Sequence, residues 1–348
     1  MPVNKPGLKG LVNVRRKAVA LSGESPVTSD FFRPEQRLPL VVRPSESGLS
    51  LVGWARPNRE FIESRLAEHG AILFRDFGMQ TAADLEAFIR ALSMEPVQYQ
   101  EATSPRTHLG GNIYTSTDYP PAERILWHNE NSHASSWPLH IFFFCETPAT
   151  QGGETPIADS RKIYRGINEP LRERFADKQL MYVRNFGDGL GLPWQSVFHT
   201  TERKEVDDHC RARGIITEWK DETRLRIRYV RPAVAAHPQT GDVVWFNHVL
   251  LFHISRREQA VREALLATYR QEDLPYNVFY GDGSPIDDAD VNAIHEIYRR
   301  ESALFSWQAG DILMLDNMLC AHGREPYAGA RKILVGMADP VTSSSITN

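Results

Sequence analysis

GDILMLDNMLCAHGREPYAGARKILVGM, residues 310–337, predicts two buried strands joined by a turn-rich segment. The two apolar runs, DILMLDN from Asp311 and KILVGM from Lys332, each closely follow a glycine, and strands are commonly bounded by such turn residues. Further strands are expected in AILFRDF from Ala71, LRIRYV from Leu225 and DVVWFN from Asp242. Short strands separated by Gly- and Pro-rich turns favour a sandwich or a barrel.

Helices are expected mainly in the first part of the chain. Residues 58–69 place apolar side chains on one side of a helix that Gly70 would end. Thr81 and Asp84 have capping-box spacing and begin a helix that runs to Leu92. Further helices are expected within 160–175 and 201–213. Helices concentrated early and strands later predict a mainly β protein with flanking helices.

The composition is that of an ordinary globular protein, since 41% of the 348 residues are hydrophobic and 24% are charged. The net charge of -4 shows no basic excess, so nucleic acid is not an expected partner. Three scattered cysteines indicate a reducing compartment rather than a disulfide framework. The sequence shows no signal peptide and no apolar run long enough to span a membrane, so we expect a cytoplasmic protein without a membrane partner.

The domain organisation is expected to be simple. Residues 1–35 mix Gly, Pro, Lys, Arg and Ser without periodicity, which indicates a partly ordered N-terminal arm. No low-complexity linker divides the remainder, so residues 36–348 are expected to form a single catalytic domain with helical insertions. The sequence leaves the oligomeric state open.

The segment WHNEN, residues 127–131, places a histidine and a carboxylate two positions apart. On an extended strand, residues i and i+2 share a face, so His128 and Glu130 can point at one position. A distant third residue, His322, would complete a set of two histidines and one carboxylate. That set is typical of non-haem Fe(II) oxygenases, in which it leaves metal positions open. By itself the triplet is weak evidence, because the chain contains 12 histidines.

The sequence around these residues is more specific. Four segments, LWHNENSH from Leu126, GGETPIADSR from Gly152, WFNHVLLFH from Trp245 and the stretch 310–337, resemble the taurine dioxygenase/TfdA-like superfamily. Its members are Fe(II)- and 2-oxoglutarate-dependent oxygenases. Glutamate rather than aspartate in the first motif is similar to the syringomycin-biosynthesis-like branch and to clavaminate synthase. The resemblance runs over about residues 38–340, with the motifs in family order.

The resemblance implies a double-stranded β-helix, or jelly roll, and assigns the cofactor-binding residues. It implies that His128, Glu130 and His322 bind Fe(II), and that dioxygen and 2-oxoglutarate react there. Arg331 matches the arginine that binds the far carboxylate of 2-oxoglutarate, for which a guanidinium fork is well suited. Thr155 matches a threonine that hydrogen-bonds the same cosubstrate. Glu130 argues against a halogenase, which needs the carboxylate position open for halide.

Two alternatives of a different class are weaker. A zinc hydrolase of the deaminase type would need a pair of cysteines, and no second cysteine lies near Cys145. A non-catalytic binding module would be expected to have lost a ligand or Arg331. Four other histidines are expected to pack or line a pocket rather than bind the metal: His133, His140, His248 and His253.

The substrate is less well defined. Taurine-type members carry a second arginine where this chain has Val335, so taurine itself is not expected. The branch resemblance implies an amino acid or an amino-acid-derived intermediate, free or held on a peptidyl carrier protein. Hydroxylation at the β-carbon is the commonest outcome there, with desaturation or cyclisation as alternatives. The candidate substrate-binding residues are Asn131, Phe246, Asn247, Arg324, Arg226 and Arg228.

Overall fold

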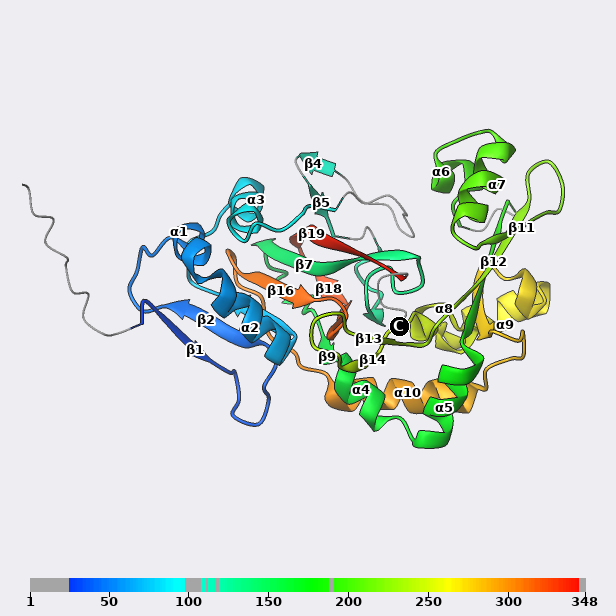
Figure 1. The fold of residues 1–348 in the computed structure, drawn as a ribbon. Helices are drawn as coiled ribbons and strands as arrows, with labels where there is room; N and C mark the ends of the chain where they lie inside the picture. The colour runs from blue at the N-terminus through cyan, green and yellow to red at the C-terminus, as the bar shows by residue number, and fades with distance from the viewer. Residues whose placement is uncertain (1–24, 98–107, 111, 117–118, 188–190, 344–348) are drawn as a thin grey trace, which may run out of the picture.

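The computed structural model describes residues 25–97, 108–110, 112–116, 119–187 and 191–343 (Figure 1). Most of the expected N-terminal arm, residues 1–24, lies outside the described residues. The rest of that arm contains the strand β1 (Val27–Asp30), which pairs antiparallel with β2 (Leu40–Pro44). No helix within the described ranges has the length and apolarity needed to cross a membrane.

The largest sheet contains both strands that the stretch 310–337 predicts. β16 (Ile312–Asp316) and β19 (Lys332–Thr342) lie on either side of β7 (Ser136–Thr147) and pair antiparallel with it. Side chains alternate across β7, so Phe142 and Phe143 enter different apolar clusters on the two faces. The full order is β1-β2-β3-β16-β7-β19-β5-β4, with β3 at Ala71–Phe74, β5 at Ile113–Thr115 and β4 at His108–Gly110.

A three-stranded antiparallel sheet packs against one face of this large sheet. Its order is β6-β17-β9, with β6 at Ile125–His128, β17 at Cys320–Arg324 and β9 at Ile157–Asp159. Ile157 and Cys320 from the small sheet share an apolar cluster with Phe143 and Val335 from the large one. The large sheet is antiparallel except where β2 pairs parallel with β3. Together the two packed sheets form the core, and the expected jelly roll with flanking helices is confirmed.

Three helices cover the other face of the large sheet: α1 (Leu51–Ala55), α2 (Arg59–His69) and α3 (Ala82–Ala91), shown in blue and cyan in Figure 1. A 3-10 turn, η1 (Arg56–Asn58), joins the first two. The expected ends of these helices are confirmed. Gly70 ends α2 with a left-handed φ of 77°, and Thr81 and Asp84 form the capping box of α3. Phe88 packs on Phe74 and Phe142 beneath them.

A second group of elements packs beside the jelly roll around its own apolar cluster. Its four-stranded sheet has the order β11-β12-β10-β15, with β11 at Ile216–Trp219, β12 at Leu225–Arg231, β10 at Leu180–Phe186 and β15 at Tyr276–Tyr280. Its helices are α4 (Ser160–Gly166), α5 (Glu169–Lys178), α6 (Trp194–Phe198), α7 (Arg203–Ala212), α8 (Val249–Phe252), α9 (Gln259–Thr268) and α10 (Asp288–Glu301). This group lies on the right of Figure 1.

The segment 160–175 forms two helices where one was expected. Ile167 is extended and ends α4, and the Asn168 side chain then accepts the N–H of Leu171 to cap α5. The helix expected within 201–213 is confirmed as α7. The remaining short elements are β8 (Gln151–Gly152), β13 (Val234–Ala236), β14 (Val243–Trp245), β18 (Tyr327–Ala328), η2 (Ile254–Arg256) and η3 (Gln271–Asp273).

Candidate active site

Strand β6 ends at His128, so the expectation that His128 and Glu130 share one strand face is wrong. The chain enters a turn at Asn129, and Asn131 adopts a left-handed φ of 55°. The N–H groups of Ser132 and Ala134 each donate to the carbonyl three residues earlier, that of Asn129 and that of Asn131. Glu130 therefore reaches its position through a turn and not through strand alternation.

A buried asparagine, Asn317, fixes this turn. Its Oδ1 accepts the N–H of Glu130 at 2.7 Å, and its Nδ2 donates to the carbonyls of Glu130 and Pro138 at 2.9 Å each. The Nδ2 of Asn129 in turn donates to the Asn317 carbonyl at 2.6 Å. Asn317 follows β16 directly, so the large sheet holds the backbone on which Glu130 sits.

The three candidate ligands converge. His322 lies directly opposite His128 across the β6–β17 ladder, and their ring centroids are 4.4 Å apart. One nitrogen or oxygen atom from each of His128, Glu130 and His322 lies within 4.8 Å of the others. Nε2 of His128 and Oε2 of Glu130 are 4.0 Å apart, a separation that one ion with bonds of ~2.1 Å can bridge. Two imidazole nitrogens and one carboxylate oxygen are a donor set suited to Fe(II).

Neighbouring groups orient these side chains. Nδ1 of His128 lies 2.9 Å from the Leu126 carbonyl, so this nitrogen carries the proton and Nε2 keeps its lone pair for a metal. Gly323 allows the chain to pass closely beside β6, because a Cβ there would lie 2.6 Å from the Ile125 carbonyl oxygen. A larger residue next to His322 would therefore push β17 away from β6.

The two residues expected to hold 2-oxoglutarate are linked through the GGETP segment, because Arg331 contacts Gly153, two residues before Thr155. Arg331 is partly buried, and its Nε donates to the Gly153 carbonyl at 2.9 Å. Burial, followed by the nearby charge of Arg324, lowers the pKa of Arg331 to about 10, so the guanidinium stays charged at neutral pH. Thr155 is buried and its Oγ1 accepts the indole N–H of Trp307 at 3.2 Å.

Lys332, the neighbour of Arg331, points away from the site. Its side chain is half exposed and forms an ion pair with Glu146 at 2.7 Å. Arg331 turns inward beside Gly153, whose left-handed backbone leaves room for it. A Cβ on Gly153 would lie 2.9 Å from Cδ of Arg331. The GGETP segment therefore supplies both a carbonyl partner for Arg331 and the space that this arginine fills.

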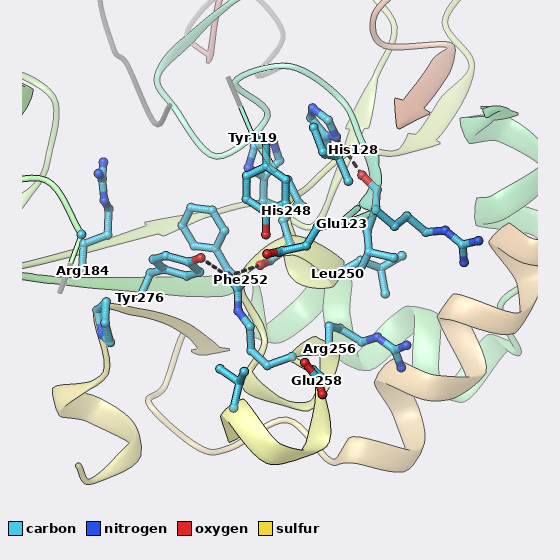
Figure 2. Close-up of a pocket in the computed structure, with 18 of the residues that line it drawn as sticks. Tyr119, Glu123, His128, Arg184, His248, Leu250, Phe252, Arg256, Glu258 and Tyr276 are labelled. Carbon is cyan, nitrogen blue, oxygen red and sulfur yellow. Dashed lines mark hydrogen bonds between the residues drawn. The ribbon is translucent and has the colours of Figure 1, made fainter. Parts of the chain in front are cut away.

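A cavity of about 680 Å³ adjoins His128 and Glu130 (Figure 2). Its wall is formed by the loop 119–124 and strand β6, by strand β10, by the segment from α8 into α9 and by the start of β15. Apolar side chains such as Leu250 and Phe252 line it together with charged ones such as Glu123 and Arg184. The cavity thus offers an apolar surface with both signs of charge next to the candidate metal ligands.

None of the six candidate substrate-binding residues lines this cavity. Asn131 lies in the turn described above. Phe246 packs on Trp137 with a ring separation of 5.0 Å. The Asn247 side chain is buried, donating to the Ala233 carbonyl and accepting the N–H of Val249 at the start of α8. Phe246 and Asn247 thus make structural contacts.

The three candidate arginines are also engaged elsewhere. Arg324 donates to the backbone carbonyls of Tyr119, Pro120 and Glu123 at 2.6–2.9 Å. Arg226 is buried, where it binds the Asn185 side chain and forms an ion pair with Asp273. Arg228 pairs with Glu218 at 2.9 Å. Arg324 thus acts on the cavity indirectly, by holding the loop that carries Tyr119 and Glu123.

His248 lines the cavity, in agreement with the expectation that it packs or lines a pocket rather than binding the metal. Its Nε2 lies 2.8 Å from the Asn129 carbonyl, and its backbone N–H donates to the Tyr182 hydroxyl at 3.0 Å. Burial, followed by the nearby His128, lowers the pKa of His248 to about 3, so the ring is neutral. His133 is buried against His248 with ring centroids 4.5 Å apart. Neither is among the described side chains that could share a metal with Glu130.

Sequence reasoning missed Asn317, Trp307 and Arg184. Asn317 had a signal, because it stands within the 310–337 stretch, but its partner Glu130 lies 187 residues away. Trp307 and Arg184 lie outside the recognised motifs, and only the fold brings them to the site.

Comparisons with known proteins agree with this arrangement. The chain matches the family described as Taurine catabolism dioxygenase TauD, TfdA family, over residues 36–338. It is 38% identical over 287 residues to the dapdiamide synthesis protein DdaC of Enterobacter agglomerans, covering 82% of this chain and 87% of that protein. It is 25% identical over 332 residues to a clavaminate synthase-like protein of Arabidopsis thaliana, covering 90% and 97% of the two chains.

Solved structures show the same fold. PvcB of Pseudomonas aeruginosa superposes with a TM-score of 0.55 at 15% identity, covering 92% of this chain and 93% of PvcB. PvcB is an Fe, α-ketoglutarate-dependent oxygenase from an isonitrile synthetic pathway. The family match extends over most of the chain and includes all of the motifs quoted above. The chain therefore belongs to the TauD, TfdA family and is an iron- and 2-oxoglutarate-dependent dioxygenase.

Proposed function

We propose that the enzyme hydroxylates an unactivated C–H bond, at the β-carbon, of an amino acid or an amino-acid-derived molecule in specialised-metabolite biosynthesis. In this proposal His128, Glu130 and His322 hold Fe(II). Arg331 and Thr155 hold 2-oxoglutarate. Residues 36–348 act as one oxygenase domain. Desaturation or cyclisation of the same substrate would use the same site.

The observation that carries the proposal is the convergence of three donor atoms at the wall of a cavity. The donors are of the types that Fe(II) takes, and the cavity beside them has the volume of an ordinary small-molecule site. Its mixture of apolar, cationic and anionic side chains suits a substrate that carries charge at one end and aliphatic carbon elsewhere. Support for a biosynthetic role comes from DdaC, whose name places it in dapdiamide synthesis.

When bound, Fe(II) and 2-oxoglutarate supply the oxidation of a C–H bond by dioxygen. The chain contributes binding and orientation. Arg331 pairs with the far carboxylate of 2-oxoglutarate, for which its charged, partly buried fork is suited. The Leu126 carbonyl keeps the proton of His128 on Nδ1, and Asn317 holds the backbone of Glu130. Apolar residues of the cavity orient the carbon chain and exclude water.

The test uses the anaerobic protein with Fe(II) and 2-oxoglutarate, and it needs no knowledge of the substrate. A visible metal-to-ligand charge-transfer band is expected in the wild type. The band should be lost in Glu130→Ala. Arg331→Ala should need a higher 2-oxoglutarate concentration than the wild type to give the same band intensity. Lys332→Ala is the matched control, because this neighbouring cation faces outward to Glu146. Absence of the band in folded wild-type protein, or its survival in Glu130→Ala, would contradict the proposal.

A further inference from the structure

Arg184 presents a guanidinium to the cavity from the middle of β10. Residues two apart on a strand share a face, so Tyr182, Arg184 and Phe186 form one row. Tyr182 accepts the backbone N–H of His248, which shows that this row faces the candidate metal site. Figure 2 places Arg184 and His128 on opposite sides of the cavity, with His248 and Phe252 between them.

The guanidinium of Arg184 has no anionic partner among the described residues. Its contact is with the ring of Phe186, whose centroid lies 5.0 Å from Cζ. The other arginines of the cavity wall are engaged. Arg124 pairs with Glu325, Arg256 donates to Asn292, and Arg257 donates to Tyr276 and Leu251.

A charge in such a position favours an anionic ligand. Arg184 is partly buried, and a guanidinium has five N–H donors arranged in a fork that matches a carboxylate. Removing these donors from water without a partner costs free energy, which a bound carboxylate would recover. Arg184 is thus the group in the cavity that is best placed to select for an anion.

The position of Arg184 also indicates the length of the substrate. Arg184 lies two positions after Tyr182, so its backbone is ~7 Å further along β10 than the residue that contacts His248. A substrate that reaches from His128 and Glu130 to Arg184 has to cross the cavity, because the two ends lie on opposite sides of it. The cavity of about 680 Å³ also exceeds what a single amino acid needs.

We propose that Arg184 binds the free carboxylate of a substrate of about dipeptide size, whose reacting carbon lies beside the candidate iron ligands. This inference rests on the proposed function, because it takes His128 and Glu130 as the reacting end of the cavity. It also separates two substrate forms that the family resemblance leaves open. A substrate held on a carrier protein has its α-carboxylate converted to a thioester, so that group is no longer free to pair with Arg184. Pairing of the α-carboxylate with Arg184 therefore requires the free acid.

The experiment is isothermal titration calorimetry on the anaerobic protein loaded with Fe(II) and 2-oxoglutarate. The probes are all dipeptides built from alanine, valine, leucine and phenylalanine, each as the free acid and as the C-terminal amide. Phosphopantetheine is a further probe, because its phosphate would report an arginine that serves a carrier arm. The variants are Arg184→Gln and Arg172→Gln. Arg172 is the matched control, since it also stacks on a ring, that of Tyr164, but lies outside the cavity.

At least one acid is expected to bind the wild type more tightly than its amide. Arg184→Gln should weaken that acid about 10- to 100-fold and leave the amide unchanged, as expected for a charge-assisted pair. Arg172→Gln should retain the preference. The inference is overturned if no acid is preferred over its amide, if the preference survives in Arg184→Gln, or if phosphopantetheine alone binds in an Arg184-dependent way.

Failure of the proposed function would look different. In that case the wild type would show no charge-transfer band with Fe(II) and 2-oxoglutarate, whatever residue stood at 184. The same titrations without metal would still measure the preference for acid over amide. Arg184→Gln should itself keep the band and its 2-oxoglutarate requirement, because it is proposed to contact the substrate alone. Loss of the band in this variant would overturn that assignment.

Discussion

Replacing Asn317 with alanine tests whether the turn that carries Glu130 sets the iron affinity. The side chain is fully buried and makes three hydrogen bonds, to the N–H and carbonyl of Glu130 and to the carbonyl of Pro138. At a net ~1 kcal/mol for each bond, Asn317→Ala should lose about 3 kcal/mol of unfolding free energy. Domains commonly have about 5–15 kcal/mol in total, so the variant should remain folded.

The same bonds hold Glu130 in place, so their loss should also weaken the metal site. Groups that orient a ligand typically change metal affinity ~10- to 100-fold when they are removed. The assay is a titration of Fe(II) into anaerobic protein with saturating 2-oxoglutarate, followed by the charge-transfer band. Urea unfolding of the metal-free protein measures the stability separately.

A buried asparagine away from the site provides the control. Asn277 accepts the N–H of Ile254 and donates to the carbonyl of Gln271, both at 3.3 Å. Asn277→Ala should lose stability but keep the Fe(II) affinity of the wild type. The reasoning would be refuted if Asn317→Ala bound Fe(II) as tightly as the wild type, or if Asn277→Ala lost affinity to the same extent.

Two further predictions concern other parts of the fold. Gly153→Ala should raise the 2-oxoglutarate requirement of the band ~10-fold with Fe(II) binding retained, because its φ is +75° and its Cβ would meet Arg331 at 2.9 Å. Gly78 has a similar φ of +70° but no atom within 4 Å of the added Cβ, so Gly78→Ala should keep the wild-type 2-oxoglutarate requirement. An equal increase in that requirement in Gly78→Ala would contradict this account. Burial lowers the pKa of His253 below 6.5, so its contribution to stability is present above that pH and lost below it. Wild-type unfolding free energy, measured between about pH 7.5 and 5.5, should therefore fall more steeply than that of His253→Gln, and parallel curves would exclude this cause.

The elements that could be predicted from sequence are those with a local signal. Thr81 and Asp84 form a capping box from residues three apart, and Gly70 ends a helix through its own backbone freedom. The strands of the 310–337 stretch are bounded by their own turn residues. In each case the deciding residues are neighbours in the chain, so no knowledge of tertiary contacts was needed.

The first motif shows where local reasoning stops. Alternation along a strand predicts that His128 and Glu130 point together, and the structure does bring them within 4.0 Å. Strand alternation is not the cause of this proximity, because β6 ends at His128. A turn in which Asn131 has a left-handed φ places Glu130 beside His128 instead. That turn depends on Asn317, which is far away in the sequence, and a local pattern contains no information about such a partner.

The cavity wall could not be predicted for the same reason. Proximity in sequence to a motif suggested Phe246 and Asn247, but these side chains pack on Trp137 and start α8. Much of the wall comes instead from β10, α9 and the loop 119–124, which carry no motif of their own. In the sequence Arg184 resembles any other strand cation, and only the fold shows that it lines the cavity with no ion pair to a described residue.

Strand β17 connects the candidate metal site to the cavity wall. It carries His322 and, two residues later, Arg324. Arg324 binds three carbonyls of the loop 119–123, and its guanidinium lies 5.2 Å from the ring of Tyr327. The guanidinium of Arg331 lies 5.4 Å from the same ring. The loop that bounds the cavity is thus attached to the strand that bears a candidate iron ligand and, through Tyr327, to the arginine expected to hold 2-oxoglutarate. A shift of β17 would therefore disturb the candidate metal site, the loop that bounds the cavity and the ring on which Arg331 lies at the same time.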